Sequence, residues 1–204
     1  MFAATLRDAV PLAGWENFYV IIGSSAAALT GLTFIVITLA ADNSAAAAAG
    51  ADARFRGLRA FITPTAVYFG TALWVAALLT VPGQTALTLG ACLTVSAAAG
   101  LGYWARVVYL LFRLGADYRP FVSDWIWSAI LPLVAYLALL ASAVMIFRHA
   151  PASLYAVAGA TLLMVFIGIH NAWDVVVWMT TERHARRERE QRRAERSAKA
   201  HTER

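Results

Sequence analysis

The sequence predicts an all-α membrane protein, a five-transmembrane-helix bundle with its N-terminus outside, its C-terminus inside and a short basic cytoplasmic tail. Of the 204 residues, 60% are hydrophobic and 14% are charged, whereas soluble domains carry about 25% charged residues. Several apolar runs reach the length of about 20 residues that a membrane-spanning helix needs. These runs are continuous and do not alternate with polar residues, which disfavours a β-barrel.

The apolar runs place the helices at residues 18–41, 58–81, 85–114, 121–147 and 154–180, and the charged tail at 181–204. A long loop rich in Ala, Gly, Asn and Ser is expected at 42–57. The turn at 81–85 is short and uncharged, so the second and third helices should form an antiparallel hairpin. Pro64 and Pro132 fall inside predicted helices, where proline removes a backbone hydrogen bond and usually causes a kink.

Aromatic residues cluster at two predicted helix starts. Trp15, Phe18 and Tyr19 precede or open the first helix, and Trp125 and Trp127 open the fourth. Tryptophan and tyrosine are enriched where a membrane meets water. We therefore expect these side chains to form interfacial belts.

The positive charge is concentrated at one end of the chain. The net charge is +5, and nine of the 17 Lys and Arg residues follow Met179. A basic end on a membrane protein favours anionic lipid headgroups over nucleic acid as its partner. Glu182 and Arg186 have the spacing that supports a helix, so the tail should be a solvated helical extension that frays. The tail residues expected to face lipid headgroups are Arg183, Arg186, Arg187, Arg189, Arg192 and Arg193.

The same charges predict the orientation. If the C-terminus is cytoplasmic, 15 of the 17 Lys and Arg residues lie on the inner side, and only Arg7 and Arg148 lie outside. Basic residues are enriched in cytoplasmic loops of membrane proteins. The abundance of Ala and the preference for Arg over Lys are typical of GC-rich bacterial genomes. The predicted location is therefore a bacterial inner membrane, with several passes and a cytoplasmic C-terminus.

The fifth predicted helix carries polar residues that lipid does not tolerate. His170, Asn171 and Asp174 share one face, since each residue of a helix turns by about 100°. An Asp near the helix centre costs about 2.5–3.5 kcal/mol on insertion scales, so this face should turn toward protein or water. Arg106 and Thr63 are expected at a similar depth. We predict that Asp174 pairs with Arg106 or His170, with Asn171 and Thr63 as further partners.

Three roles for this polar cluster follow from the sequence. The leading hypothesis is a non-enzymatic membrane protein in which the cluster mainly fixes helix packing. The first alternative is a proton, ion or small-solute channel or transporter subunit that uses His170 and Asp174, because intramembrane His and Asp are common in proton relays. The second is an accessory subunit that docks through its basic tail. No catalytic triad, metalloprotease motif or paired catalytic carboxylates are present, so we expect no enzymatic activity, cofactor or metal.

A stripe of small residues lies on the first predicted helix. Gly23, Ala27 and Gly31 recur every four residues and would allow another helix to approach closely. The first interpretation is packing within one chain, and the alternative is a seam of a homo-oligomer. Cys92 is the single cysteine and cannot form an internal disulfide.

Three runs carry a resemblance to known sequences: WENFYVIIG at 15–23, ALTGL at 28–32 and GIHNAWD at 168–174. In these runs the chain resembles a group of small bacterial integral-membrane proteins of unknown function. The resemblance covers the five predicted helices and leaves out the tail. It implies a polytopic fold in a bacterial inner membrane, and it assigns no functional residue.

Overall fold

The computed structural model describes residues 10–45, 51–114 and 125–202, and every regular element in these ranges is helical. The elements are α2 (Glu16–Ala45), α3 (Ala51–Thr80), α4 (Ala86–Leu114), the π-helix η1 (Ile126–Ile130), α6 (Leu131–Phe147) and α7 (Ser153–Thr202). Four segments of the described residues are long and apolar enough to cross a membrane, and α3 contributes a shorter one, Pro64–Thr80. The predicted all-helical membrane class is therefore confirmed.

Three helix boundaries differ clearly from the predicted ones. α3 begins at Ala51, and α2 ends at Ala45, so most of the loop predicted at 42–57 is helical. The alanines there favour helix more than any other residue does. α7 continues without a break from its apolar part through the charged tail to Thr202. The sequence had separated these two parts as a span and an extension.

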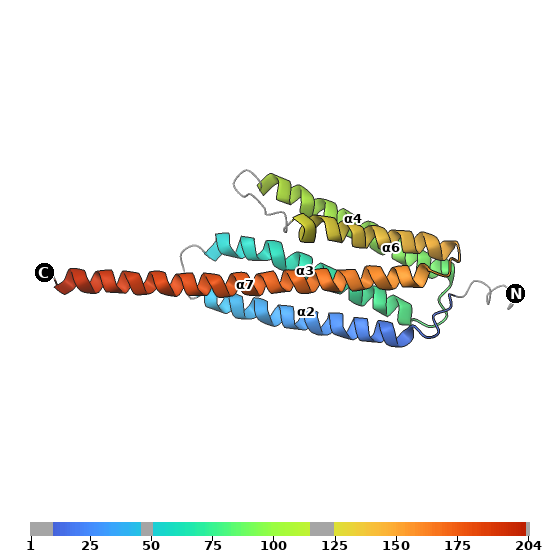
Figure 1. Cartoon of the computed structure of the whole chain (residues 1–204), viewed down its shortest axis with the longest axis horizontal. Coiled ribbons are helices and arrows are strands. Elements are labelled where there is room, and N and C mark those ends of the chain that lie inside the picture. Colours follow the sequence, from blue (N-terminus) through green and yellow to red (C-terminus); the bar gives the residue numbers. More distant parts are fainter. Residues whose placement is uncertain (1–9, 46–50, 115–124, 203–204) are drawn as a thin grey trace.

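α7 is the central helix of the bundle (Figure 1). It packs against α3 on one side and α6 on the other, while α2 covers α3 and α4 covers α6. The N-terminal part of the chain and the turns before α4 and α7 gather at one end of the bundle. The C-terminus lies far beyond the opposite end. The four candidate spans and the shorter one in α3 make five consecutive segments of alternating direction, and an odd number of such segments places the two termini at opposite ends.

Glycines facing large rings decide which helices pair. A Cβ added at Gly100 of α4 would overlap the ring of Tyr136 on α6, and one at Gly90 would lie 2.7 Å from Phe147. A Cβ at Gly168 of α7 would lie 2.5 Å from the ring of Phe69 on α3. Small residues permit such close approach, which supplies packing energy where lipid provides no hydrophobic drive between helices.

The predicted antiparallel hairpin of α3 and α4 is present, but it is open. The turn between the two helices is short, as expected, and Gly83 adopts a positive φ of 71° in it. The helices nevertheless touch over only a short stretch. α4 instead follows the pairing that its glycines make with α6, and a groove opens between α3 and α4.

The predicted small-residue stripe packs at one position only. Gly23 is buried, and a Cβ there would lie 3.2 Å from Ala76 of α3. Ala27 and Gly31 are exposed, and nothing lies within 4 Å of a Cβ built at Gly31. Packing within one chain is therefore wrong for these two residues. The seam between copies stays a prediction.

The start of the predicted fourth helix is a π-helix. In η1 the backbone N–H of Leu131 donates to the carbonyl of Ile126, five residues earlier. Pro132 follows directly and has no N–H to donate. π-turns are typical where the regular hydrogen-bond ladder is interrupted. The predicted disturbance by Pro132 thus takes the form of one wide turn.

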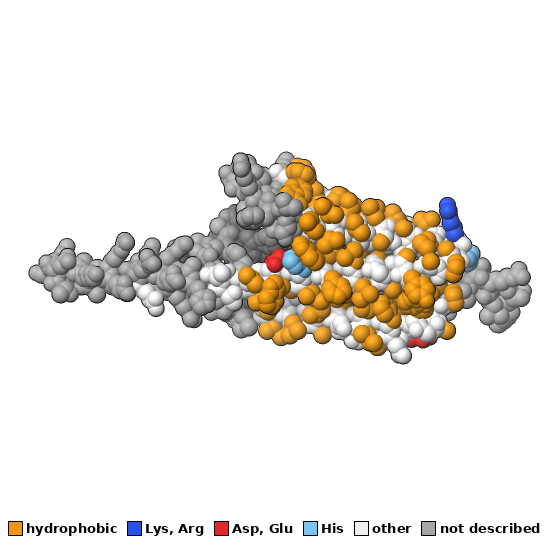
Figure 2. Space-filling model, in the orientation of Figure 1, with side chains coloured by type: hydrophobic (Ala, Val, Ile, Leu, Met, Phe, Trp, Pro, Cys, Tyr) orange, Lys and Arg blue, Asp and Glu red, His pale blue; other side chains and the backbone are white. Residues whose placement is uncertain are grey.

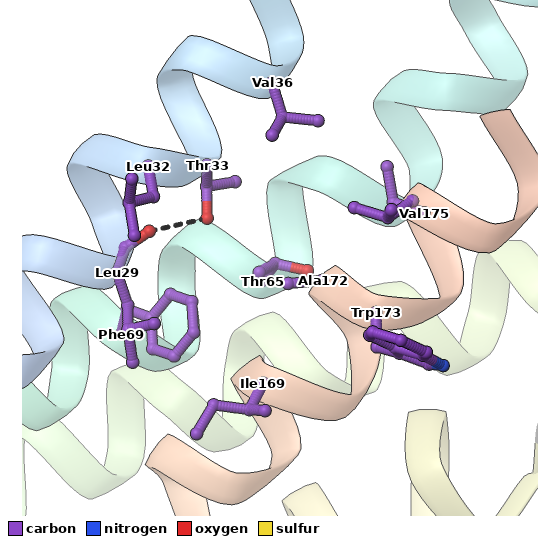
Figure 3. Close-up of a pocket in the computed structure, with 11 residues that line it drawn as sticks. Leu29, Leu32, Thr33, Val36, Thr65, Phe69, Ile169, Ala172, Trp173 and Val175 are labelled. Carbon is purple, nitrogen blue, oxygen red and sulfur yellow. Dashed lines mark hydrogen bonds between the residues drawn. The ribbon is translucent and has the colours of Figure 1, made fainter. Parts of the chain in front are cut away.

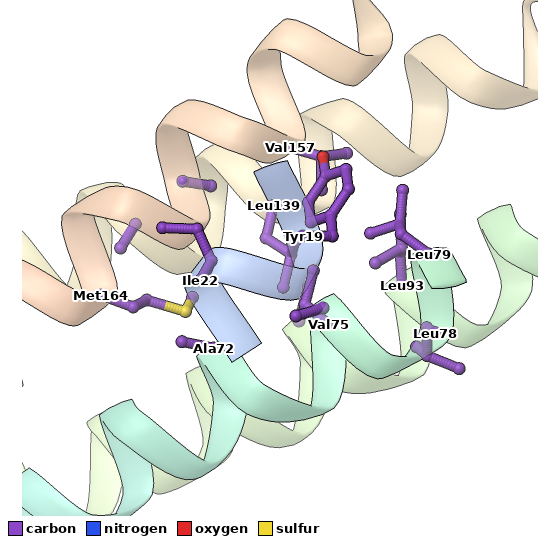
Figure 4. Close-up of a cluster of buried hydrophobic side chains, with 14 of the residues drawn as sticks. Tyr19, Ile22, Ala72, Val75, Leu78, Leu79, Leu93, Leu139, Val157 and Met164 are labelled. Atoms are coloured by element: carbon purple, nitrogen blue, oxygen red, sulfur yellow. The ribbon is translucent and has the colours of Figure 1, made fainter. Parts of the chain in front are cut away.

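The core joins all the long helices (Figure 4). Tyr19 of α2 is only 1% exposed, and its hydroxyl lies 3.5 Å from the carbonyl oxygen of Leu154 on α7. The prediction that Tyr19 belongs to an interfacial belt is therefore wrong. On the face seen in Figure 2 the described side chains form a broad hydrophobic band, with charged side chains and histidines only toward its two ends. Exposed large hydrophobic side chains include Ile21, Val95 and Phe166.

We predict that Gly100→Ala destabilises the bundle by about 1–3 kcal/mol, the usual cost of overpacking a tight contact. Tyr136 is fully buried and has no room to move away. The matched control is Gly102→Ala, two residues along α4, where a Cβ meets nothing within 4 Å. Equilibrium unfolding in mixed micelles should show a lower free energy of unfolding for Gly100→Ala and an unchanged one for Gly102→Ala. An equal loss in both would contradict the pairing of α4 with α6.

Candidate functional site

The polar face of α7 contains one ion pair. His170 Nε2 lies 3.3 Å from Asp174 Oδ2, one turn along the helix. The side chain of His170 is 28% exposed and that of Asp174 is 53% exposed. The apolar span of α7 ends at Val177, so Asp174 lies within one turn of its end. Asp174 is therefore shallower and more open than the sequence implied, while the i, i+4 contact is present as predicted.

An indole covers the imidazole of His170. The ring of Trp127 lies parallel to it, with 3.7 Å between ring centroids and 20° between the planes. Trp127 belongs to η1, and the sequence assigned it to an interfacial belt. The structure adds that the half-buried ring packs on α7, and the belt stays a prediction. The π-turn contains one residue more than a turn of a regular α-helix. The side chains beside it are therefore rotated about the helix axis by about 100° from their expected positions. The hydropathy of the sequence does not reveal this rotation. The nearby Pro132 was the only available signal.

A second tryptophan ties η1 to α4. The indole Nε1 of Trp104 donates a hydrogen bond to the carbonyl oxygen of Ala129, at 2.7 Å. A backbone carbonyl in a membrane interior needs such a donor whenever the regular ladder is interrupted. Trp104 therefore stabilises the π-turn from α4, and the π-turn holds Trp127 on His170. We name Trp104, Trp127, His170 and Asp174 the indole–histidine clasp.

Arg106 does not belong to this clasp. Among the described residues Asp174 forms an ion pair with His170 and none with Arg106. α4 and α7 are not in contact, because α6 and η1 lie between them. Arg106 is exposed and comes three residues after Tyr103 on α4. The first of the two predicted partners of Asp174 is therefore wrong, and the second is present.

Of the remaining predicted members, only the Asn171 side chain lies in the described part of the structure. Asn171 is half-buried, and its side chain has no hydrogen bond among the described residues. Thr63 lies in α3, but its side chain is outside the described part of the chain. The same holds for the side chains of the tail arginines that were expected to face lipid, Arg183, Arg186, Arg187, Arg189, Arg192 and Arg193.

A cavity of about 240 Å³ lies on the other side of α7 (Figure 3). It is bounded by α2, α3 and α7, with Leu29, Phe69 and Ile169 among its walls. The hydroxyl of Thr33 donates to the carbonyl oxygen of Leu29 at 2.8 Å and leaves the cavity mainly apolar. His170 and Asp174 do not line it. This cavity therefore provides no polar route to the clasp.

The contacts at the clasp fix the orientation of the His170 side chain. One face of the imidazole is covered by indole and one edge meets a carboxylate, so the ring has a defined orientation. Among the described side chains, no three His, Cys, Asp or Glu residues lie close enough to share a metal ion. Comparison with family models, curated proteins and solved structures finds no match. The resemblance seen in the sequence remains a prediction.

We predict that Trp127→Leu lowers the free energy of unfolding by more than the lost buried area accounts for. The additional loss should be about 0.5–1.5 kcal/mol, the usual contribution of a contact between two aromatic rings. The control is Trp173→Leu, whose ring is 66% exposed and whose loss should stay within about 0.5 kcal/mol. Unfolding of both variants in mixed micelles measures the difference. A control variant as unstable as Trp127→Leu would contradict a specific contact with His170.

Proposed function

We propose that the protein is a non-enzymatic membrane anchor whose last helix leaves the bilayer as a rigid arm and holds a partner at the cytoplasmic face. The arm is the part of α7 beyond the apolar span. The observation that carries the proposal is the continuity of α7 from Ser153 to Thr202. The span ends at Val177, so 25 residues continue as helix, which is about 37 Å at 1.5 Å per residue.

The clasp has a role in this proposal. His170 and Asp174 lie within two turns of Val177, at the base of the arm. Contact with Trp127 opposes rotation of α7 about its own axis. A helix transmits its rotation along its whole length, so the clasp sets the direction in which the arm presents its charges. Hydrogen bonds within membranes average about 0.6 kcal/mol, which suits a positional role better than a large contribution to stability.

The charge of the arm supports a polar partner. From Thr181 to Arg204 the sequence has nine Lys and Arg and five Glu residues, with no large apolar side chain. Such a helix has no apolar face to bury in lipid. Its positive excess favours an acidic protein surface or anionic headgroups. We propose a protein partner, in a bacterial inner membrane, with the C-terminus in the cytoplasm.

Ion or proton transport through the clasp has less support. Within the described spans, Asp, Glu, Lys, Arg and His occur only near the two ends and at Arg106, His170 and Asp174. The half of the bundle nearer the N-terminal end contains no chain of such groups in its described part. Proton relays need titratable groups along the whole path. The arrangement therefore favours anchoring.

The orientation predicts the behaviour of reporter fusions. Green fluorescent protein fused after Arg204 should fluoresce, and alkaline phosphatase fused there should be inactive, because that end is cytoplasmic. Fusions made after His149, which omit one span, should show the opposite pattern and serve as the control. An active phosphatase at the full-length C-terminus would reverse the proposed orientation.

The arm is tested by breaking it. Ala194→Pro interrupts the helix at a cost of about 3 kcal/mol without changing its charge, and Ala194→Ser is the matched control. A photo-crosslinking residue at Ala198 should form a discrete protein adduct in cells with the wild type and the serine variant. The proline variant should lose it, while unfolding of the bundle stays unchanged.

Two outcomes would contradict the anchor proposal. The first is crosslinking of the wild type to lipid only, which would place the arm on the membrane. The second is an adduct that survives Ala194→Pro, which would show that a rigid arm is not needed.

A further inference from the structure

The groove between α3 and α4 is a second feature of the bundle, separate from the clasp and the arm. Its volume is about 630 Å³, and its walls include Gly70 and Trp74 of α3 and Val95 and Tyr103 of α4. Tyr136 of α6 forms part of its lining, although that side chain is almost fully buried. Sites for small molecules span about 300–1,000 Å³. The groove is therefore large enough for a ligand.

The polar side chains at the middle of the groove have partners, and one of these hydrogen bonds runs from α3 to α4. Trp74 Nε1 donates to Ser96 Oγ at 2.9 Å, and Ser96 Oγ donates in turn to the carbonyl of Cys92 at 2.7 Å. Thr71 Oγ1 donates to the carbonyl of Val67 at 2.8 Å and lies 3.4 Å from the hydroxyl of Tyr136. Few donors remain for a sugar or a nucleotide. The surface offered to an occupant is mainly apolar.

The shape of the groove fits an acyl chain. On α4 it extends from Ala91 to Tyr103, twelve residues along the helix, which is about 18 Å at 1.5 Å per residue. One leaflet of the hydrocarbon core is about 15 Å thick, half of a bilayer core of about 30 Å. The groove lies at the middle of the α4 span, Ala86–Leu110, so an acyl chain that starts near Arg106 would fill it by reaching past the membrane midplane. Trp74 and Val95 are 53% and 69% exposed, so the groove opens sideways toward lipid. A chain can enter without leaving the membrane.

A positive charge lies just beyond one end of the groove. Arg106 comes three residues after Tyr103 on α4, so the two side chains occupy neighbouring positions on one face of the helix, and Arg106 is exposed. It has no ion pair among the described residues, which distinguishes it from the His170–Asp174 pair. Arg106 is four residues from Leu110, where the apolar span of α4 ends, so it can extend toward headgroups. Arginine binds phosphate through charge-assisted, often bidentate, hydrogen bonds.

We propose that this groove is a binding site for one anionic phospholipid, with an acyl chain between α3 and α4 and the phosphate at Arg106. The lipid comes from the leaflet at the C-terminal end of the bundle. It fills the space that the open α3–α4 hairpin leaves, and so completes the packing of α4. A helix of a second copy is the competing occupant, and the experiment distinguishes it from lipid.

The test uses the full chain, delipidated and then titrated with phosphatidylglycerol or phosphatidylcholine of identical acyl chains, with binding measured by native mass spectrometry. The wild type should bind phosphatidylglycerol about tenfold more tightly than phosphatidylcholine. This factor corresponds to the free energy of one charge-assisted hydrogen bond. Arg106→Gln should abolish this preference. Arg148→Gln, an exposed arginine at the other end of the bundle, should retain it.

A second pair of variants tests the groove itself. Gly70→Leu fills it from a position where a Cβ meets nothing within 4 Å, and Gly102→Leu adds the same side chain outside it. The first should reduce binding of both lipids at least tenfold, and the second should not. If Gly70→Leu does not fold, Val95→Trp replaces it, because Val95 is an exposed part of the wall.

Three results would overturn the proposal: equal binding of the two lipids by the wild type, equal effects of Arg106→Gln and Arg148→Gln, or unchanged binding in the groove-filling variant. A dimer that dissociates on filling the groove while lipid binding stays unchanged would assign the groove to a second copy instead.

Discussion

Close contact between a glycine on one helix and an aromatic ring on the next is the constraint on which this bundle depends. Gly100 and Gly90 of α4 accept the rings of Tyr136 and Phe147, and Gly168 of α7 accepts Phe69. Lipid chains are as apolar as leucine, so helices in a membrane associate through such packing and not through burial from water. Each contact joins two particular helices. Together they place α4 on α6 and α3 on α7, so α3 and α4 contact each other over only a short stretch although a short turn connects them.

The clasp and the groove both result from this arrangement. Because α4 lies on α6, Trp104 reaches the carbonyl of Ala129 in η1, and η1 in turn presents Trp127 to His170. For the same reason Arg106 stays on the far side of α6 from Asp174, next to the open groove. The two polar regions of the bundle are therefore separate. In the functions that we propose, one positions the helix that leaves the membrane, and the other binds lipid.

The continuous α7 connects the membrane part to the charged part. Interruption of this helix at the membrane surface would allow the charged segment to move independently of the bundle. Its continuity instead couples the two, because the backbone hydrogen bonds of a helix resist bending and twisting over many turns. A contact such as that between Trp127 and His170 can then influence the position of charges several turns away. This coupling is the physical basis of the role that we propose for the contact between Trp127 and His170.

The sequence by itself determined the membrane class, the approximate spans and the His170–Asp174 contact, because hydropathy, helix period and charge are properties of one segment at a time. It also identified Pro132 as a point of disturbance. Only the tertiary structure decided that Trp127 covers His170, that Tyr19 is buried, that Ala27 and Gly31 face outward and that Arg106 lies apart from Asp174. These outcomes depend on which glycine meets which ring on another helix. That match of shapes between distant segments leaves no periodic signal in the chain.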